Sequence, residues 1–312
     1  MSEQSHAKVD IVRGFPGLRA LVLGDAMLDT YLEGKATRLC KEGPAPVVRR
    51  MATGRAPGGA ANAAANVAAL GADVVFVGLI GRDEPGSHLR ASLRERGVSD
   101  RWLVEDDAVG TLHKVRVLAD GQYVVRFDEG DTRDCTREGR DRLLTHVDVA
   151  YPHCDAVIVS DYGYGVASDR MIALLNALRR TRPRVLAIDS KQIARFRHAS
   201  ADIVTPNLNE ARQAVDPLVS IDDPIGIDGA REIGRKLRRS LVCDWLAVTM
   251  AADGVLLFGR DGEMHHLPAH PVDRPADVGA GDSFTAALAL ACSCSCPRTR
   301  GRPRGAPRQG AR

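Results

Sequence analysis

A short segment near the end of the chain combines small residues with an acidic one where a helix is expected to begin. Its sequence is Gly279-Ala280-Gly281-Asp282, followed by an apolar run of helical character. Small side chains let backbone N–H groups approach an anion closely, and the unpaired N–H groups and dipole of a helix N-terminus favour negative charge. Asp282 is placed to accept a proton from a hydroxyl group, so the segment suits phosphoryl transfer to an alcohol. An acidic residue at this position also serves as an ordinary helix cap.

A second pair of polar residues follows a short β-rich run. Asn207 and Glu210 are three residues apart at the start of a predicted helix. That spacing places an amide and a carboxylate on one side of the helix, where they suit hydrated magnesium near phosphates. The same spacing defines a capping box, and the pair by itself favours this structural interpretation.

Two further motifs lie in the first quarter of the chain. Asp25 and Asp29 follow the first apolar run, and carboxylates at the carboxyl end of a strand in an α/β sheet face the ligand crevice, where they suit sugar hydroxyls. A Gly-Gly pair ending at Gly59 opens an Ala-rich helix with Asn62 in its first turn; the pair suits either a hinge or a tight turn. The segment 81–88 has the glycine spacing of a P-loop but ends in Ser87-His88 and lacks the lysine that this loop requires.

Alternating strands and helices must position these residues. Apolar β-rich runs alternate with helical stretches, which predicts a largely parallel sheet covered by helices on both faces. The predicted strands are 18–24, 74–79, 156–160, 185–189, 203–205 and 245–249 with a hairpin over 255–267, and the predicted helices are 59–70, 86–96, 168–180, 209–215, 228–239 and 280–291. Segments 31–51 and 111–128 interrupt this alternation and are expected to form a small antiparallel lid.

Composition limits the classes of protein that fit. The 312 residues, 44% hydrophobic and 27% charged, suffice for one large domain. There is no apolar run of about 18 residues and no secretory signal, so we expect no membrane segment, a cytoplasmic location and reduced cysteines. The net charge of +3 comes from the last 21 residues, which hold six arginines and no acidic residue; with only 4% aromatics, no nucleic-acid surface is predicted. We expect a domain over 1–291 and a disordered Arg/Cys/Pro/Gly tail over 292–312.

Taken in chain order, these motifs resemble those of the ribokinase-like (PfkB) carbohydrate kinases over residues 18–291. Within that family the chain is most similar to the D-glycero-β-D-manno-heptose 7-phosphate kinases, on the stretches 38–47, 57–66, 114–117 with 126–128, and 160–165. The resemblance implies a three-layer αβα sandwich with a mostly parallel sheet and a small β lid. It further implies transfer of the ATP γ-phosphoryl group to O1 of the heptose phosphate, toward ADP-heptose, and a homodimer formed through the lid.

The resemblance also implies a role for each motif. Asp282 becomes the general base, and Gly279, Ala280 and Gly281 bind the anion. The nucleotide side would comprise Lys191, Thr249 and Ala251, with Asn207 and Glu210 organising Mg2+ through water; the sugar side would comprise Asp25, Asp29, Gly59 and Asn62. A substrate that already carries a phosphate needs cations, for which the lid residues Arg38, Lys114 and Arg116 are candidates unless they are ordinary solvated charges.

Departures from the family pattern keep two other functions open. Ala251 stands where the family has glycine, so that a Cβ atom would crowd ATP, and Val278 stands where it has threonine. Tyr164 replaces a lysine, and the tail from Cys292 replaces further helix. One alternative is therefore another PfkB-type sugar or nucleoside kinase. The other is a non-catalytic relative that binds nucleotide or sugar and is impaired by its altered C-terminus.

Overall fold

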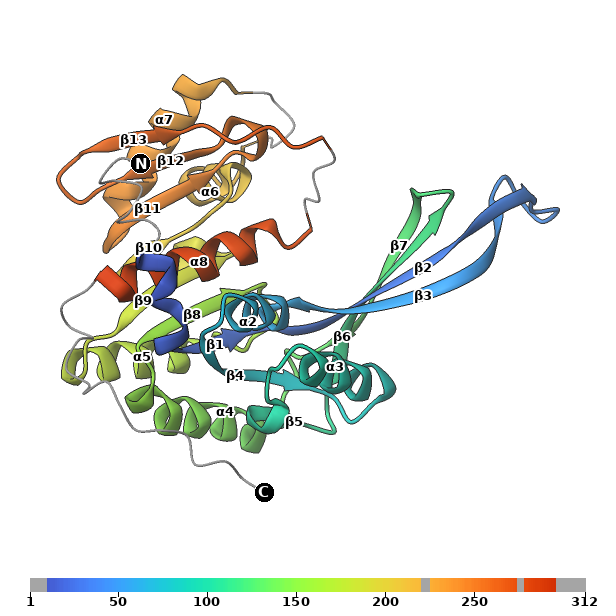
Figure 1. Ribbon diagram of the computed structural model, residues 1–312, viewed down its shortest axis with the longest axis horizontal. Helices are drawn as coiled ribbons and strands as arrows, with labels where there is room; N and C mark the ends of the chain where they lie inside the picture. Colours follow the sequence, from blue (N-terminus) through green and yellow to red (C-terminus); the bar gives the residue numbers. More distant parts are fainter. Residues whose placement is uncertain (1–9, 220–224, 274–277, 296–312) are drawn as a thin grey trace.

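The computed structural model describes residues 10–219, 225–273 and 278–295, which form an αβα sandwich with a projecting arm (Figure 1). The central sheet has nine strands in the order β13-β12-β11-β10-β9-β8-β1-β4-β5, and all of them run in the same direction except β12, which pairs antiparallel with both β11 and β13. Its strands are β1 Arg19–Gly24, β4 Asp73–Ile80, β5 Leu103–Glu105, β8 Ala156–Asp161, β9 Val185–Ser190, β10 Ala201–Val204, β11 Cys243–Thr249, β12 Val255–Phe258 and β13 Met264–Leu267. The predicted fold class is confirmed.

Helices cover both faces of this sheet because alternate strand residues point to opposite sides. In β1, Leu21 and Leu23 join the core cluster beneath helices α4, α5, α6 and α7, whereas Ala20 and Val22 join the cluster beneath α2, α3 and α8. The helices are α2 Ala60–Ala69, α3 Glu84–Glu95, α4 Arg137–Ala150, α5 Asp169–Thr181, α6 Leu208–Val215, α7 Ile227–Ser240 and α8 Ala280–Ser295. None of the helices within the described ranges is long and apolar enough to cross a membrane.

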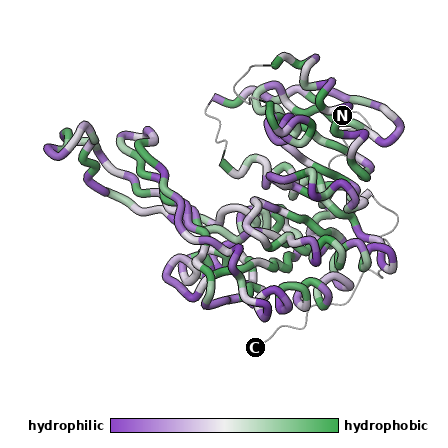
Figure 2. Tube along the Cα trace, turned by 180° about the vertical axis from the view of Figure 1, so that it is seen from behind, coloured by the Kyte–Doolittle hydropathy of each residue, from purple (hydrophilic) through white to green (hydrophobic). Residues whose placement is uncertain are grey.

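The lid is a separate four-stranded sheet that extends away from the body (Figure 2). Its strands are β2 Ala26–Leu39, β3 Pro46–Gly59, β6 Gly110–Ala119 and β7 Gln122–Asp131, in the order β3-β2-β6-β7. The two hairpins are antiparallel as predicted, but β2 and β6 pair in parallel. The lid is also longer than the predicted segments 31–51 and 111–128, because β2 begins one residue after Asp25 and β3 continues directly into α2.

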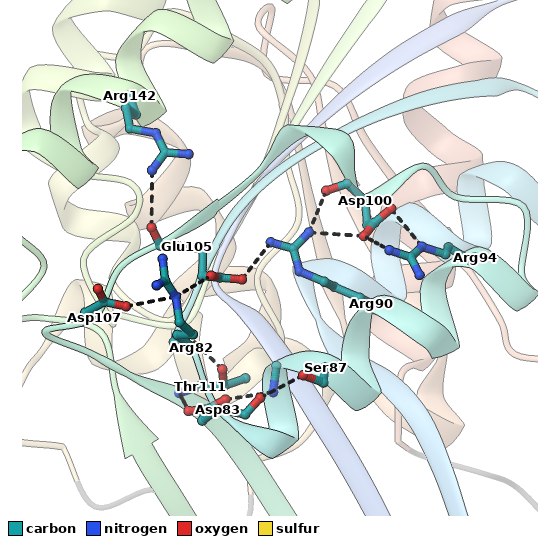
Figure 3. A network of polar contacts seen from close by, with 12 residues as sticks. Arg82, Asp83, Ser87, Arg90, Arg94, Asp100, Glu105, Asp107, Thr111 and Arg142 are labelled. Carbon is teal, nitrogen blue, oxygen red and sulfur yellow. Dashed lines mark hydrogen bonds and ion pairs between the residues drawn. The ribbon is translucent and has the colours of Figure 1, made fainter.

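A polar network fixes the base of the lid to the body (Figure 3). The Asp83 carboxylate caps α3 by accepting the Gly86 N–H at 2.8 Å, and it also accepts the N–H of Thr111 in β6 at 2.7 Å. On the outer side of α3, Arg90 donates to both Asp100 and Glu105. These hydrogen bonds hold lid strand β6 to α3 of the body at the point where the lid begins.

Two sequence predictions about helices were wrong. Helix α4 was not predicted, although Thr136 caps it through a 3.0 Å bond from the Gly139 N–H. Helix α8 continues to Ser295, four residues past the predicted boundary, with Cys292 and Cys294 packed against the core. Cysteine behaves as a small hydrophobic residue, so these positions extend the buried side of α8 despite their unusual composition. The rest of the predicted tail, 296–312, lies outside the described residues.

Candidate active site

A cavity of about 640 Å3 lies at the carboxyl ends of β9, β10 and β11, facing the start of α8. This is where ligands bind in open α/β sheets. The residues predicted for catalysis and nucleotide binding all line it: Lys191, Asn207, Glu210, Thr249, Ala251, Gly279, Ala280, Gly281 and Asp282. The fold thus brings four separate sequence motifs into one cavity.

Asp282 is held in the first turn of α8 by two donors from other elements. Asn62 of α2 donates its Nδ2 to Oδ2 at 2.8 Å, and the Tyr162 hydroxyl donates to Oδ1 at 3.3 Å. The side chain is only 4% exposed, and this burial raises the pKa of Asp282 to about 6, although both hydrogen bonds favour the charged form. A carboxylate with a pKa near neutrality is suited to accept a proton from a substrate hydroxyl.

The segment 279–281 provides the backbone for an anion site. Gly279 has φ of +83°, and a Cβ atom there would lie 2.5 Å from Asn62 Nδ2, so both its conformation and its surroundings require glycine. A Cβ atom at Gly281 would lie 3.8 Å from the Asp189 carboxylate, so glycine leaves the backbone open on the side of Asp189. The first N–H groups of α8 are therefore uncovered on the cavity side.

Asn207 and Glu210 form the capping box that the sequence left as an alternative. Asn207 Oδ1 accepts the Glu210 N–H at 2.9 Å, and Glu210 Oε2 accepts the Asn207 N–H at 2.8 Å. Glu210 Oε1 additionally forms an ion pair with Lys191. Burial opposes the charge of Lys191, but Glu210 and Asp189 raise its pKa overall.

The donor set around Glu210 fits a magnesium ion that is shared with phosphates. Within the described ranges, no group of three or more His, Cys, Asp or Glu side chains is arranged to hold a metal ion. Magnesium in nucleotide sites is bound by one or two carboxylates, and phosphates and water complete its shell. Glu210, Asp189 and the Asn207 amide supply that limited set at the edge of the cavity.

Asp189 and Tyr162 line the cavity but were not predicted as site residues. Asp189 lies at the end of β9; burial raises its pKa to about 8, and the nearby carboxylates of Glu210 and Asp282 act in the same direction. Tyr162 directly follows β8. The signal that identifies both is their place at the carboxyl end of a buried parallel strand, the same rule that drew attention to Asp25.

Asp25 contacts the loop after β8. Its carboxylate is fully buried and accepts backbone N–H groups of Tyr162 at 2.7 Å, Tyr164 at 3.2 Å and Val166 at 3.3 Å. Burial raises the pKa of Asp25 to about 6, with Asp161 adding to the effect. Asp25 therefore holds the loop after β8 in place, and its contact with a sugar stays a prediction.

Gly59 and Asn62 lie where the sequence placed them, at the start of α2 beside the cavity. Gly59 has φ of +54°, and a Cβ atom there would lie 2.7 Å from the Asp25 carbonyl oxygen. Only glycine fits this junction between β3 and α2. Asn62 is one turn further on and donates to Asp282, so it holds that carboxylate directly.

The three candidate lid cations have different surroundings. Arg116 donates to Asp29 Oδ1 at 2.6 Å, and both side chains are 9% exposed, so this cation is already paired. Arg38 is exposed and lies nine residues beyond Asp29 along β2, roughly 30 Å at the rise of a strand. Lys114 is partly buried, and its ammonium lies 5.4 Å from the centre of the Tyr162 ring. Of the three, Lys114 alone contacts a residue that lines the cavity.

Ala251 adopts a conformation that favours glycine, with φ of +48°. A left-handed conformation costs a residue with a Cβ atom roughly 1–2 kcal/mol. Ala251 lines the cavity, and its methyl group occupies space that the family pattern leaves to glycine. Val278, the other departure beside the site, is 51% exposed.

Comparisons with known proteins agree with this geometry. A model of the pfkB family of carbohydrate kinases matches residues 18–294. "Bifunctional protein HldE" of Azorhizobium caulinodans is 36% identical over 272 residues, covering 86% of this chain and 55% of that protein. The protein of the same name from Nitrobacter winogradskyi is 34% identical over 278 residues, covering 88% and 56%. The chain thus spans about half the length of these curated relatives.

Solved structures show the same fold. Phosphofructokinase-2 from Escherichia coli in complex with fructose-6-phosphate superposes with a TM-score of 0.69 at 19% identity, covering 88% of this chain and 86% of that one. Arabidopsis thaliana ribokinase complexed with ribose and ATP gives 0.65 at 21% identity, with the same two coverages. The arrangement of sheet, helices and lid is therefore shared at low sequence identity.

Proposed function

The chain belongs to the pfkB family of carbohydrate kinases, and from this premise we propose that it phosphorylates O1 of D-glycero-β-D-manno-heptose 7-phosphate, toward ADP-heptose. It is a phosphotransferase with an alcohol group as acceptor. The substrate proposal is supported by the four stretches that resemble heptose 7-phosphate kinases and by relatives named HldE. The observation that carries it is Lys114, a partly buried lid cation whose ammonium lies 5.4 Å from the ring centre of Tyr162, the residue that donates to Asp282.

The described residues support each part of an in-line transfer. Asp282 accepts the proton of the O1 hydroxyl while O1 bonds to the γ-phosphorus of ATP and the bond from that phosphorus to ADP breaks. The N–H groups at 279–281 bind the negative charge that develops on the transferred group. Lys191 lies in the same cavity and balances the phosphate charge. We assign Asn207 and Glu210 to Mg2+, held through water; bound there, the ion supplies further positive charge to the phosphates.

The direct test is ADP release from Mg-ATP with a panel of acceptors. The panel contains D-glycero-β-D-manno-heptose 7-phosphate, the same heptose without phosphate, fructose 6-phosphate, ribose and adenosine. We expect the highest kcat/KM with the heptose 7-phosphate. A higher value with an unphosphorylated acceptor indicates the alternative kinase. Binding of Mg-ATP without ADP release on any acceptor indicates the non-catalytic relative.

Substitution of Lys114 tests the recognition of the substrate phosphate. A charge-assisted hydrogen bond contributes about 1.5–3 kcal/mol, so Lys114→Met is expected to raise KM for the sugar phosphate roughly 10- to 100-fold. Unphosphorylated acceptors have no such bond to lose, and their KM is expected to stay within about twofold. Initial-rate kinetics on both acceptor classes measure the difference.

Arg38→Met is the matched control, because Arg38 is an exposed cation of the same lid sheet far from the base. It is expected to leave both KM values unchanged. Equal losses in the two variants would mean that lid charge acts only through long-range attraction, and the role of Lys114 would be wrong.

We also propose that two copies of the chain pair through the lid. Strand β7 is an edge strand whose side chains are exposed along nearly its whole length, and the exposed side chains of Val125 and Phe127 share one face, opposite Val117 and Val115 of β6. Sedimentation velocity of the full chain is expected to show a dimer, and Val125→Lys is expected to shift it to monomer because a charge would be buried at the contact. A dimer that persists in this variant would place the interface elsewhere.

A further inference from the structure

Tyr162 contacts three groups that no other described side chain brings together. Its hydroxyl donates to Asp282 Oδ1 at 3.3 Å. Its ring centre lies 5.4 Å from the ammonium of Lys114, on lid strand β6, and 5.4 Å from the ammonium of Lys191, just after β9. Cations at this distance from an aromatic ring are attracted by its negative face. One side chain therefore links the lid, the nucleotide side and the base.

The backbone holds this side chain in place. The Tyr162 N–H donates to Asp25 at 2.7 Å, and the next N–H, of Gly163, donates to Asp161 at 3.1 Å. Gly163 has φ of +85°, and a Cβ atom there would lie 2.8 Å from Gln192 Nε2. The turn is thus fixed by two buried carboxylates and by a position that requires glycine, so the Tyr162 hydroxyl is presented to Asp282 by a rigid segment.

We infer that Tyr162 is a positioning residue for the phosphoryl transfer: its hydroxyl orients the Asp282 carboxylate toward the acceptor, and its ring holds the two lysines in register with that carboxylate. The inference deepens the proposed function and rests on it for the identity of the acceptor. Each carboxylate oxygen can accept more than one hydrogen bond, so Asn62 and Tyr162 can fix Asp282 and still leave a lone pair for the acceptor proton.

The electrostatic surroundings keep Tyr162 a donor. Burial and the charges of Asp282 and Asp189 raise the pKa of Tyr162 above its usual range, so the hydroxyl stays protonated at every working pH. Beside Tyr162, the titratable groups near Asp282 are Asp29, Asp189 and Lys191, with Glu210 paired to Lys191. Because the hydroxyl bonds to the charged form of the base, removing it favours the protonated form.

Tyr162→Phe tests the hydroxyl while keeping the ring, and Tyr164→Phe is the control in the same loop. For Tyr162→Phe we expect kcat to fall about tenfold and KM for both substrates to stay within about twofold. We also expect the acidic limb of the kcat/KM profile to move upward by about half a pH unit. Tyr164→Phe is expected to change none of these. Tyr162→Leu removes the ring as well. It is expected to raise KM for both ATP and the acceptor, because the ammonium groups of Lys191 and Lys114 lose their contact with the aromatic ring.

A titration that needs no turnover separates this inference from the proposed function. The carboxyl carbon of Asp282 is followed by NMR against pH, with Asp282→Asn identifying the signal. A higher midpoint in Tyr162→Phe than in the unchanged protein supports the inference even if no acceptor is phosphorylated. An unchanged or lower midpoint overturns it, whatever the acceptor proves to be, as does an acidic limb that moves equally in Tyr164→Phe.

Discussion

Replacement of Asp282 by asparagine is expected to lower kcat about 1,000-fold and to leave Mg-ATP binding intact. General base catalysis by a positioned side chain contributes typically about 100- to 10,000-fold, and the amide cannot accept the acceptor proton. Asparagine has nearly the same shape, and its one amide oxygen can still accept from either Asn62 or Tyr162, so the fold is expected to persist. Steady-state kinetics with thermal unfolding of both proteins measure the two effects. A loss below about tenfold would assign the proton to another group, with Asp189 the next candidate in the cavity.

The pH dependence of the unchanged protein should report the same residue. Burial raises the pKa of Asp282 to about 6, and only the charged form accepts a proton. Activity is therefore expected to be full above this pKa and to decline as the pH falls through about 6. This acidic limb should be absent from the residual activity of Asp282→Asn.

The second large effect is expected at the ion pair that joins two lid strands. Arg116 and Asp29 pair at 2.6 Å, and removal of one partner of a buried pair leaves an uncompensated charge at a cost of about 3–5 kcal/mol. Because Arg116 would keep its contact with the Tyr31 ring, we expect Asp29→Ala to lower the free energy of unfolding by about 3 kcal/mol, the lower end of this range. Urea unfolding measures this loss.

Asp128→Ala is the control for this pair, since Arg126 and Asp128 form an exposed pair on the neighbouring strand of the same lid. Exposed pairs contribute about 0–1 kcal/mol, so little change is expected. The double variant Asp29→Ala with Arg116→Met should recover part of the loss, because the stranded charge is removed as well. Equal costs for Asp29→Ala and Asp128→Ala would show that the lid pair is open to solvent in the working protein.

Sequence patterns predicted the sandwich well because its strands and helices depend on local periodicity. The run at Arg19–Gly24 is a buried strand, and the Ala-rich run at Ala60–Ala69 is a helix, close to the predicted bounds. The ends of helices, and helices with few buried positions, were less predictable. The composition around Cys292 and Cys294 predicted a disordered tail. Both residues nevertheless extend α8, because their side of the helix packs against the core. Helix α4 was missed because its outward positions are largely polar and only a few positions, such as Val147, are buried.

The candidate site also combines features that local sequence predicts with features that depend on tertiary packing. Its anion-binding start of α8 and its Asn207–Glu210 capping box are built from residues within four positions of one another, so backbone geometry alone relates them, and the sequence by itself determined both. The charge state and task of each side chain depend on partners far away in the chain. Arg116 is neutralised by a residue 87 positions away, and Asp282 is held by a tyrosine 120 positions away. Electrostatic interactions depend on distance through space and on burial, which only the packing of the sheet, the lid and α8 sets. Only this packing places the Lys114 ammonium beside the Tyr162 ring, Asp25 against the loop after β8, and Tyr162 in the cavity with Asp282.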